Sequence, residues 1–318
     1  MIAGLVLLQA ALSIGVAGPA TNLEYLPLRV AAAEGYFADE RLTVTLETPR
    51  SEPLAAQALG RGQVSMAATS LDAALQLGHG AGGPPRLVFG LTAAPPVVLL
   101  VPAAKKDSIK AVADLVGKTV GIVAPGTPGE LALFSLLTRE GIGVNRVTIE
   151  SFGERALVGA VESGAIDAAV LQDPWASRLL DEGKVAALAD LRTAAEAARW
   201  LGGPTVHAAL FVPADARPGG LVPLARALLR ALARIRAATP EELGATLPPA
   251  VVGSPEDFAL RLRGIRGLYL PDGEVTADAF SHSVALVRAR TVIPTKARMP
   301  TFLGRLLLME PLQEALRR

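Results

Sequence analysis

The stretch LSIGVAGPATNLEYLPLRVAAAEGYFADERL, Leu12–Leu42, decides the fold that we predict. Its apolar start, Leu12–Val16, predicts a strand, and a loop of small and polar residues follows. Pro27 suits the first turn of a helix, where its missing N–H costs nothing, and Gly35 suits the left-handed residue that ends one. A second strand is expected from near Leu42. The helix N-terminus then faces the loop, where it attracts anions and hydrogen-bond acceptors.

The composition indicates a globular protein with a large core and excludes several kinds of function. The chain has 318 residues, 51% of them hydrophobic and 19% charged, the opposite of a disordered chain. Lysine and arginine number 31 against 30 acidic residues, without a long basic tract, which argues against nucleic acid as a partner. The absence of cysteine excludes cysteine nucleophiles, disulfides, thiolate metal sites and a lipid-modified N-terminal cysteine.

The first residues, 1–11 (MIAGLVLLQAA), are apolar and uncharged. They are too few for a transmembrane helix, which needs about 20 residues. We interpret them as the remnant of a secretory signal whose basic start lies upstream, because small residues follow the apolar part. The alternative is a buried strand or helix end of a cytosolic protein. The signal interpretation predicts a periplasmic protein without a lipid anchor.

The rest of the chain predicts an α/β fold in two lobes. Strands and helices alternate in the first hundred residues and again over Lys105–Leu188, where glycine joints indicate a parallel sheet with helices on both faces. From Gly220 the chain becomes mostly helical, with a long amphipathic helix over Leu221–Ala237. We expect the chain to cross between lobes near Ala93–Val101 and Val206–Val212. Lobe I then comprises 12–95 plus 208–318, and lobe II comprises 96–207.

Three loops share one layout, in which a strand, a small polar loop and a helix start follow one another: Ala17–Tyr25, Ala68–Asp72 and Ala124–Glu130. Each offers backbone N–H groups and a helix dipole, and ligands of such folds bind at the carboxyl ends of strands. Together the three loops would make a polar clamp with little net charge. Taken singly, each is more simply an ordinary capped joint, and the third lacks the Gly-Lys-Ser/Thr of a phosphate loop.

Other candidates have both a functional and a structural interpretation. Gln172 and Asp173 place an amide and a carboxylate at a strand end, although Asp173 is more simply a helix N-cap. Trp175 either stacks on a ligand or packs between helices. Arg155 suits bidentate contact with an anion, but a solvated role is simpler. His207 lies near a predicted crossing, and we favour a structural role for it over catalysis.

Several motifs, in their order and spacing, resemble ABC-transporter periplasmic solute-binding proteins of the nitrate/sulfonate/taurine and thiamine-pyrimidine (NMT1/THI5-like) family. They cover nearly the whole chain after Ala11. Besides Leu12–Leu42, the motifs are Leu115–Gly121, Gly126–Gly129, Gly164–Val170, Asp173-Pro174-Trp175, the helix Pro223–Thr239 and Pro240-Glu241-Glu242.

The resemblance implies a type II periplasmic-binding-protein fold, in which two lobes joined by two crossing strands close on a solute. It implies a non-enzymatic monomer without cofactor or metal, which delivers its solute to an ABC permease and ATPase. Family ligand contacts, carried over by position, fall on Asn22, Glu24, Tyr25, Thr69, Ser70, Gly126, Thr127, Gly129, Gln172 and Asp173.

Two departures leave the ligand open between a small anion, such as a sulfonate, nitrate or taurine, and a pyrimidine-type solute. Thr127-Pro128 stands where sulfonate and nitrate binders commonly have serines, and Glu24 would repel an anion if it pointed inward. Two alternatives remain for the whole protein. One is a pyrimidine-precursor synthase on the same fold, which would rely on cysteine and histidine motifs. The other is a ligand-sensing domain of a regulator.

Overall fold

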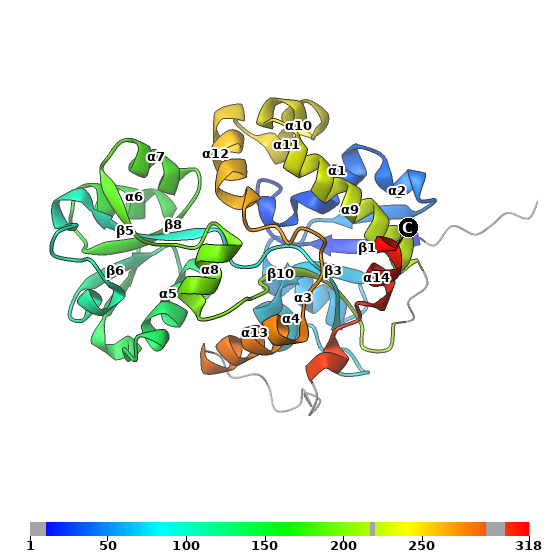
Figure 1. The fold of residues 1–318 in the computed structure, drawn as a ribbon, viewed down its shortest axis with the longest axis horizontal. Helices are drawn as coiled ribbons and strands as arrows, with labels where there is room; N and C mark the ends of the chain where they lie inside the picture. Colours follow the sequence, from blue (N-terminus) through cyan, green and yellow to red (C-terminus); the bar gives the residue numbers. More distant parts are fainter. Residues whose placement is uncertain (1–10, 217–219, 291–302, 318) are drawn as a thin grey trace, which may run out of the picture.

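The computed structural model describes residues 11–216, 220–290 and 303–317. It has a type II periplasmic-binding-protein fold, with two α/β lobes side by side along the long axis of the molecule (Figure 1). Except for Ala11, the predicted signal remnant lies outside the described residues. None of the helices in the described ranges has the length and apolar character needed to cross a membrane.

The first sheet has the strand order β2-β1-β3-β10-β4. β1 pairs in parallel with β2 and β3, whereas β10 runs antiparallel between β3 and β4. The strands β3 and β10 are completely buried at this centre, and β1 is buried over its last three residues, Ile14–Val16, in keeping with their apolar sequences. Their bounds are β1 Ala11–Val16, β2 Thr43–Glu47, β3 Met66–Ser70, β4 Arg86–Gly90 and β10 Ala208–Val212.

The second sheet has the order β7-β6-β8-β5-β9 and is mixed. The strands that begin within Lys105–Leu188 share one direction, as we predicted, and the antiparallel strand β5 precedes that stretch. β6 pairs in parallel with β7 and β8, but β5 runs antiparallel to β8 and β9. The antiparallel direction of β5 results from the crossing of the chain between the lobes. β5 is the first strand after the chain enters lobe II, just as β10 is the first strand after it returns, and each runs against its neighbours. The bounds are β5 Val97–Pro102, β6 Thr119–Ile122, β7 Thr148–Ser151, β8 Ala168–Gln172 and β9 Val185–Asp190.

Helices cover both sheets. In lobe I they are η1 Leu23–Tyr25, α1 Leu26–Ala33, α2 Tyr36–Asp39, α3 Glu52–Gly60, α4 Leu71–Leu77, α9 Leu221–Ala237, α10 Pro240–Thr246, α11 Pro249–Val252, α12 Pro255–Arg266, α13 Ala277–Arg290, η5 Leu303–Leu306 and α14 Glu310–Leu316. In lobe II they are η2 Ala103–Lys105, η3 Val112–Leu115, α5 Pro128–Arg139, η4 Val144–Arg146, α6 Glu154–Glu162, α7 Trp175–Asp181 and α8 Ala194–Leu201.

The strand, loop and helix that we predict from Leu12–Leu42 are confirmed. Pro27 lies in the first turn of α1, and Gly35 follows the helix with a φ of 74°. A side chain added to Gly35 would meet nothing within 4 Å, so its left-handed backbone is what favours glycine there. The next residues continue as the short helix α2, whose Phe37 is buried.

The helix α9 packs across α1 and α2, and arginines join its polar side to them. Arg226 binds Glu40 at 2.6 Å and Arg234 binds Glu34 at 3.3 Å. Between them, Arg230 lies over the ring of Tyr36 at 4.1 Å. The arginine stripe that the sequence shows is therefore a contact between the late helix and the first helices of lobe I.

The two crossings between the lobes are bonded to each other. Leu91 and Thr92 donate backbone hydrogen bonds to the carbonyl of Ala208 at 2.8 and 3.1 Å, and His207 donates to the carbonyl of Thr92 at 2.8 Å. The hydroxyl of Thr205 donates to the carbonyl of Ala93 at 2.8 Å. These contacts lie at the predicted crossings. The lobe boundaries themselves remain a proposal, which the membership of the two sheets supports.

Asp167 is expected to be important for the stability of lobe II. Lys105 binds its Oδ1 at 2.8 Å, and the backbone N–H of Thr119 donates to its Oδ2 at 2.9 Å. Asp167→Asn should lower the free energy of unfolding by about 1–3 kcal/mol, because both bonds lose the carboxylate charge. Urea denaturation measures the loss, and exposed Asp107→Asn is the control. Equal midpoints for the two variants would contradict this role.

The same carboxylate should make stability depend on pH. Burial alone would raise the pKa of Asp167, but the hydrogen bonds from Lys105 and Thr119 outweigh it and lower this pKa below the ordinary 3.8. The carboxylate therefore contributes stability above pH 3.8, and the contribution is lost as the pH falls through the lower native pKa. Urea midpoints measured between pH 6 and pH 2 should fall more steeply for the wild type than for Asp167→Asn.

Candidate functional site

A cavity of about 450 Å³ lies at the junction of the two lobes. Lobe I lines it with the loop after β1 and with one side of α12, and lobe II lines it with the β8–α7 turn and the start of α6. This volume lies within the range of small-molecule sites. The lining residues are Pro19, Thr21, Asn22, Leu23, Pro96, Glu154, Gln172, Asp173, Pro174, Trp175, Asp257, Arg261 and Ile265.

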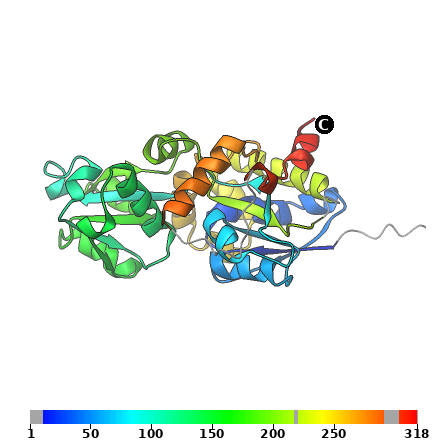
Figure 2. The ribbon, with the colours of Figure 1, turned by 90° about the horizontal axis from the view of Figure 1, so that it is seen from below.

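Two helices connect the lobes beside this junction. α12 of lobe I reaches α7 of lobe II, where Arg178 forms a close ion pair with Asp257. On another side, α13 contacts both α4 of lobe I and α5 of lobe II, and it spans the junction in Figure 2. The cavity therefore lies between lobes that touch through the crossings, α12 and α13.

Asn22 fixes the loop that lobe I contributes. Its Oδ1 accepts from the backbone N–H of Glu24 at 2.9 Å, which caps η1, and its Nδ2 lies 3.3 Å from Glu24 Oε2. Gly18 turns the chain before it with a φ of 77°. Asn22 consequently presents an amide to the cavity while it holds Glu24 in place.

Asp173 has a structural role, but the N-cap of α7 is Pro174 and not Asp173, which we predicted. Asp173 instead binds the first turn of α7 from one residue earlier. Its Oδ1 accepts from the backbone N–H of Ser177 at 2.9 Å, and Arg192 Nη1 lies 3.2 and 3.1 Å from its two oxygens. The Asp173 side chain is only 4% exposed. Its carboxylate is thus already neutralised, and it positions the neighbouring Gln172 and Trp175 at the cavity.

Arg261 is a positively charged residue that lines the cavity. The sequence contains no indication of this role, because Arg261 lies within α12 rather than in a loop. Its Nη2 donates to the carbonyl of Val252 at 2.7 Å, whereas its buried Nε has no hydrogen-bond partner among the described residues. Burial lowers the pKa of Arg261, and the carboxylate of Asp257 opposes that shift. Guanidinium stays charged at neutral pH, so Arg261 offers an anion a partly desolvated donor.

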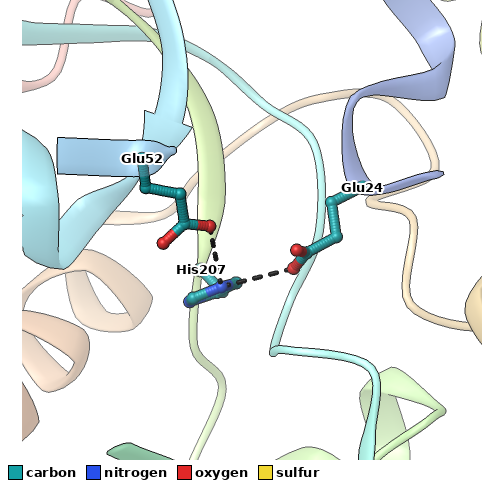
Figure 3. A group of neighbouring side chains, drawn as sticks. All are labelled: Glu24, Glu52 and His207. Carbon is teal, nitrogen blue, oxygen red and sulfur yellow. Dashed lines mark ion pairs between the residues drawn. The ribbon is translucent and has the colours of Figure 1, made fainter. Parts of the chain in front are cut away.

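A second polar group lies at the carboxyl edge of the first sheet, where Glu24, Glu52 and His207 converge (Figure 3). His207 Nε2 is 3.2 Å from Glu24 Oε1 and 3.9 Å from Glu52 Oε1. The Tyr25 hydroxyl donates to Glu52 Oε1 at 3.0 Å. Burial alone would lower the pKa of His207, but Glu24, Glu52 and Asp72 raise it to about 9. We call Glu24, Glu52 and His207 the acidic triad.

The ten predicted contact residues separate into three groups. Asn22, Gln172 and Asp173 line the cavity. Four others lie in or around the acidic triad: Glu24, Tyr25, Thr69 and Ser70 are all buried. Gly126, Thr127 and Gly129 precede or begin α5 and do not line this cavity. That these residues contact a ligand remains a prediction.

Several predicted donors already have partners within the protein. The hydroxyl of Thr69 donates to the carbonyl of Glu52 at 2.9 Å, and Ser70 accepts from Ala73 as the N-cap of α4. The hydroxyl of Thr127 donates to the carbonyl of Ala124 at 2.7 Å. Arg155 is exposed and does not line the cavity.

Sequence reasoning missed Glu52, Glu154 and Arg261. Two of them had a signal, because Glu52 and Glu154 begin helices directly after strands, as the three predicted loops do. His207 was noticed only for its place near a crossing. Its two carboxylate partners come from the loops after β1 and β2, which only the assembled sheet brings together.

Comparisons with known proteins agree on one family of proteins. A family model described as NMT1/THI5 like matches residues 22–234. A search of curated proteins finds no match. Among solved structures, a protein of Bordetella bronchiseptica RB50 is 25% identical, with coverage of 97% of this chain and 98% of the other and a TM-score of 0.75.

Two further solved structures share the fold. The alkanesulfonate-binding protein SsuA of Xanthomonas axonopodis pv. citri, bound to MOPS, is 21% identical, with coverage of 94% and 98% and a TM-score of 0.61. The periplasmic aliphatic sulphonate binding protein SsuA of Escherichia coli is 19% identical, with coverage of 88% and 86% and a TM-score of 0.68. The fold also occurs in an enzyme, DszB, so it does not exclude catalysis.

Removal of Arg192 should destabilise the cavity wall. Arg192→Met would leave the buried carboxylate of Asp173 without its cation, and we expect a loss of about 3–5 kcal/mol in the free energy of unfolding. The control is Arg199→Met, whose ion pair with Glu196 is exposed, and which should cost less than about 1 kcal/mol. Chemical denaturation measures both, and similar losses would show that Asp173 does not depend on Arg192.

Proposed function

This chain belongs to the NMT1/THI5-like family, and from that premise we propose that it is the extracytoplasmic solute-binding subunit of an ABC importer. One observation carries the proposal: the cavity of about 450 Å³ is lined by both lobes, at a junction that two crossings span. A solute bound there contacts both lobes at once, so its binding energy favours the closed arrangement over an open one. The closed form would be the one that a permease and its ATPase accept.

We propose a small organic sulfonate as the solute, with taurine as the first choice. Arg261 supports this because it is a cation that lines the cavity, and its buried Nε has no hydrogen-bond partner among the described residues. Glu154 lines the same cavity from lobe II. Because Asp173 and Asp257 are paired with arginines, Arg261 and Glu154 offer one charge of each sign, which suits a zwitterion. Asn22 and Gln172 add neutral amides.

The position of Glu24 supports an anion as the solute. Glu24 is 1% exposed and its Oε1 lies 3.2 Å from His207 Nε2. It does not line the cavity. An anion held by Arg261 would therefore meet Asn22 and Leu23 from this loop rather than the Glu24 carboxylate.

A binding role without catalysis fits the groups at the cavity. Asp173 is paired with Arg192, and Asp257 with Arg178, so both carboxylates already have a cationic partner within the protein. The chain contains no cysteine nucleophile. A pyrimidine-type solute is the second candidate, because Trp175 lines the cavity and an aromatic ring can stack on a pyrimidine.

The fluorescence of Trp175 can report the binding of a solute. The chain has two tryptophans, so Trp200→Phe leaves the cavity tryptophan as the single reporter of binding. We expect taurine or another sulfonate to change its fluorescence and to raise the melting temperature with ligand concentration. The reciprocal variant, Trp175→Phe, should keep the thermal shift and lose most of the fluorescence change. If sulfonates, nitrate and aminopyrimidines all leave both signals unchanged, the proposed solute classes are wrong.

Arg261 should set the affinity for the anionic group. Arg261→Gln should weaken sulfonate binding at least about tenfold, because a charge-assisted hydrogen bond contributes about 1.5–3 kcal/mol. Arg61→Gln changes an exposed arginine outside the cavity and should leave the dissociation constant unchanged. Calorimetric titration of both variants makes the comparison. Equal affinities would place the anion elsewhere, and tighter binding of a pyrimidine than of any sulfonate would favour the second candidate.

A further inference from the structure

The acidic triad contains two atoms whose bonding is incomplete. Neither Glu24 Oε1 nor His207 Nε2 has a hydrogen-bond partner of acceptable geometry among the described residues, although the two atoms are only 3.2 Å apart. Their side chains are 1% and 8% exposed. Water therefore has little access to either atom, and a buried polar atom without a partner destabilises the fold. Both atoms are directed at the space between the three side chains (Figure 3).

We propose that Glu24, Glu52 and His207 bind a zinc ion in lobe I, at a site separate from the solute cavity. One ligand atom from each residue lies within 4.8 Å of the other two. Zinc bonds nitrogen and oxygen ligands at about 2.0–2.2 Å, so tetrahedral ligands are about 3.3–3.6 Å apart. The measured separations from His207 Nε2, 3.2 and 3.9 Å, lie close to this range.

Charge favours a divalent cation at this place. When zinc binds His207 Nε2 it releases the proton of that nitrogen to solvent, and the ion then neutralises the two negative charges of the carboxylates. A proton on His207 neutralises only one of them. Because Glu24 and Glu52 lie in a little-exposed site, the uncompensated charge is costly without the ion. Imidazole with carboxylates is a donor set that zinc accepts, with a fourth position left for water.

Neighbouring side chains hold the ligands as a metal site requires. Asn22 Nδ2 lies 3.3 Å from Glu24 Oε2, which leaves Oε1 for the ion. The Tyr25 hydroxyl donates to Glu52 Oε1, and Ser70 also hydrogen-bonds that carboxylate. Such outer contacts orient the ligands and strengthen metal binding.

The site is least enclosed at Glu52 and beside His207. Glu52 is 15% exposed, the most of the three ligands. His207 also lines a small open cavity of about 40 Å³ together with Asp72 and Thr205. A volume of this size admits a water molecule.

The test is a titration with zinc chloride of the full chain without an affinity tag, after dialysis against a chelator. We expect one strong site by calorimetry and a melting temperature that rises with zinc concentration. Cobalt(II) in place of zinc should give the visible absorption bands of a tetrahedral N,O site. These readouts need no solute, so they remain informative even if the proposed transport function is wrong.

Glu24→Gln and Glu52→Gln should each weaken zinc binding at least tenfold while the far-ultraviolet circular dichroism stays unchanged. Two variants are used so that a folding defect in one leaves the other informative. Glu256→Gln is the control, because its side chain is 79% exposed and lies outside the triad. Absence of strong zinc binding to the wild type, or equal binding to all three variants, would overturn the proposal.

Discussion

Pairing between the two chain crossings is the constraint on which this structure depends. Hydrogen bonds join Leu91 and Thr92 to Ala208, and Thr205 to Ala93, so the outgoing and returning segments behave as one short ladder. Both lobes are connected through that ladder. Their relative positions can therefore change mainly by rotation about it. The interlobe cavity and the acidic triad both border the same ladder, through Pro96 in one case and His207 in the other.

The sequence predicted the elements well because they depend on local chemistry. Pro27, Gly35 and Ser70 mark helix starts and ends through backbone geometry that needs no distant partner. The long helix Leu221–Ala237 was predicted with the bounds that the structure shows, since its amphipathic period is unbroken. The antiparallel direction of β5 was not predicted, because strand direction depends on where the chain enters a sheet, which a local pattern does not contain.

The candidate site was harder to predict because its charges pair over long distances in sequence. Asn22, Gln172 and Asp173 follow strands and were found by that rule. Arg261 lies within a helix, and its incomplete bonding appears only once α12 is packed against its neighbours. Likewise, Glu24 changes from a residue that would repel an anion into a partner of His207 once the loop after β1 is folded.

The strand order of the first sheet also fixes an order of assembly. β10 lies between β3 and β4, so that sheet stays divided until the chain has been synthesised beyond Val212. The second sheet uses only Val97–Asp190, a continuous segment with shorter separations between partners. Contacts that are distant in sequence form more slowly. The inserted lobe is therefore the part expected to fold first as the chain emerges, and the lobe that contains the N-terminal strand is completed last.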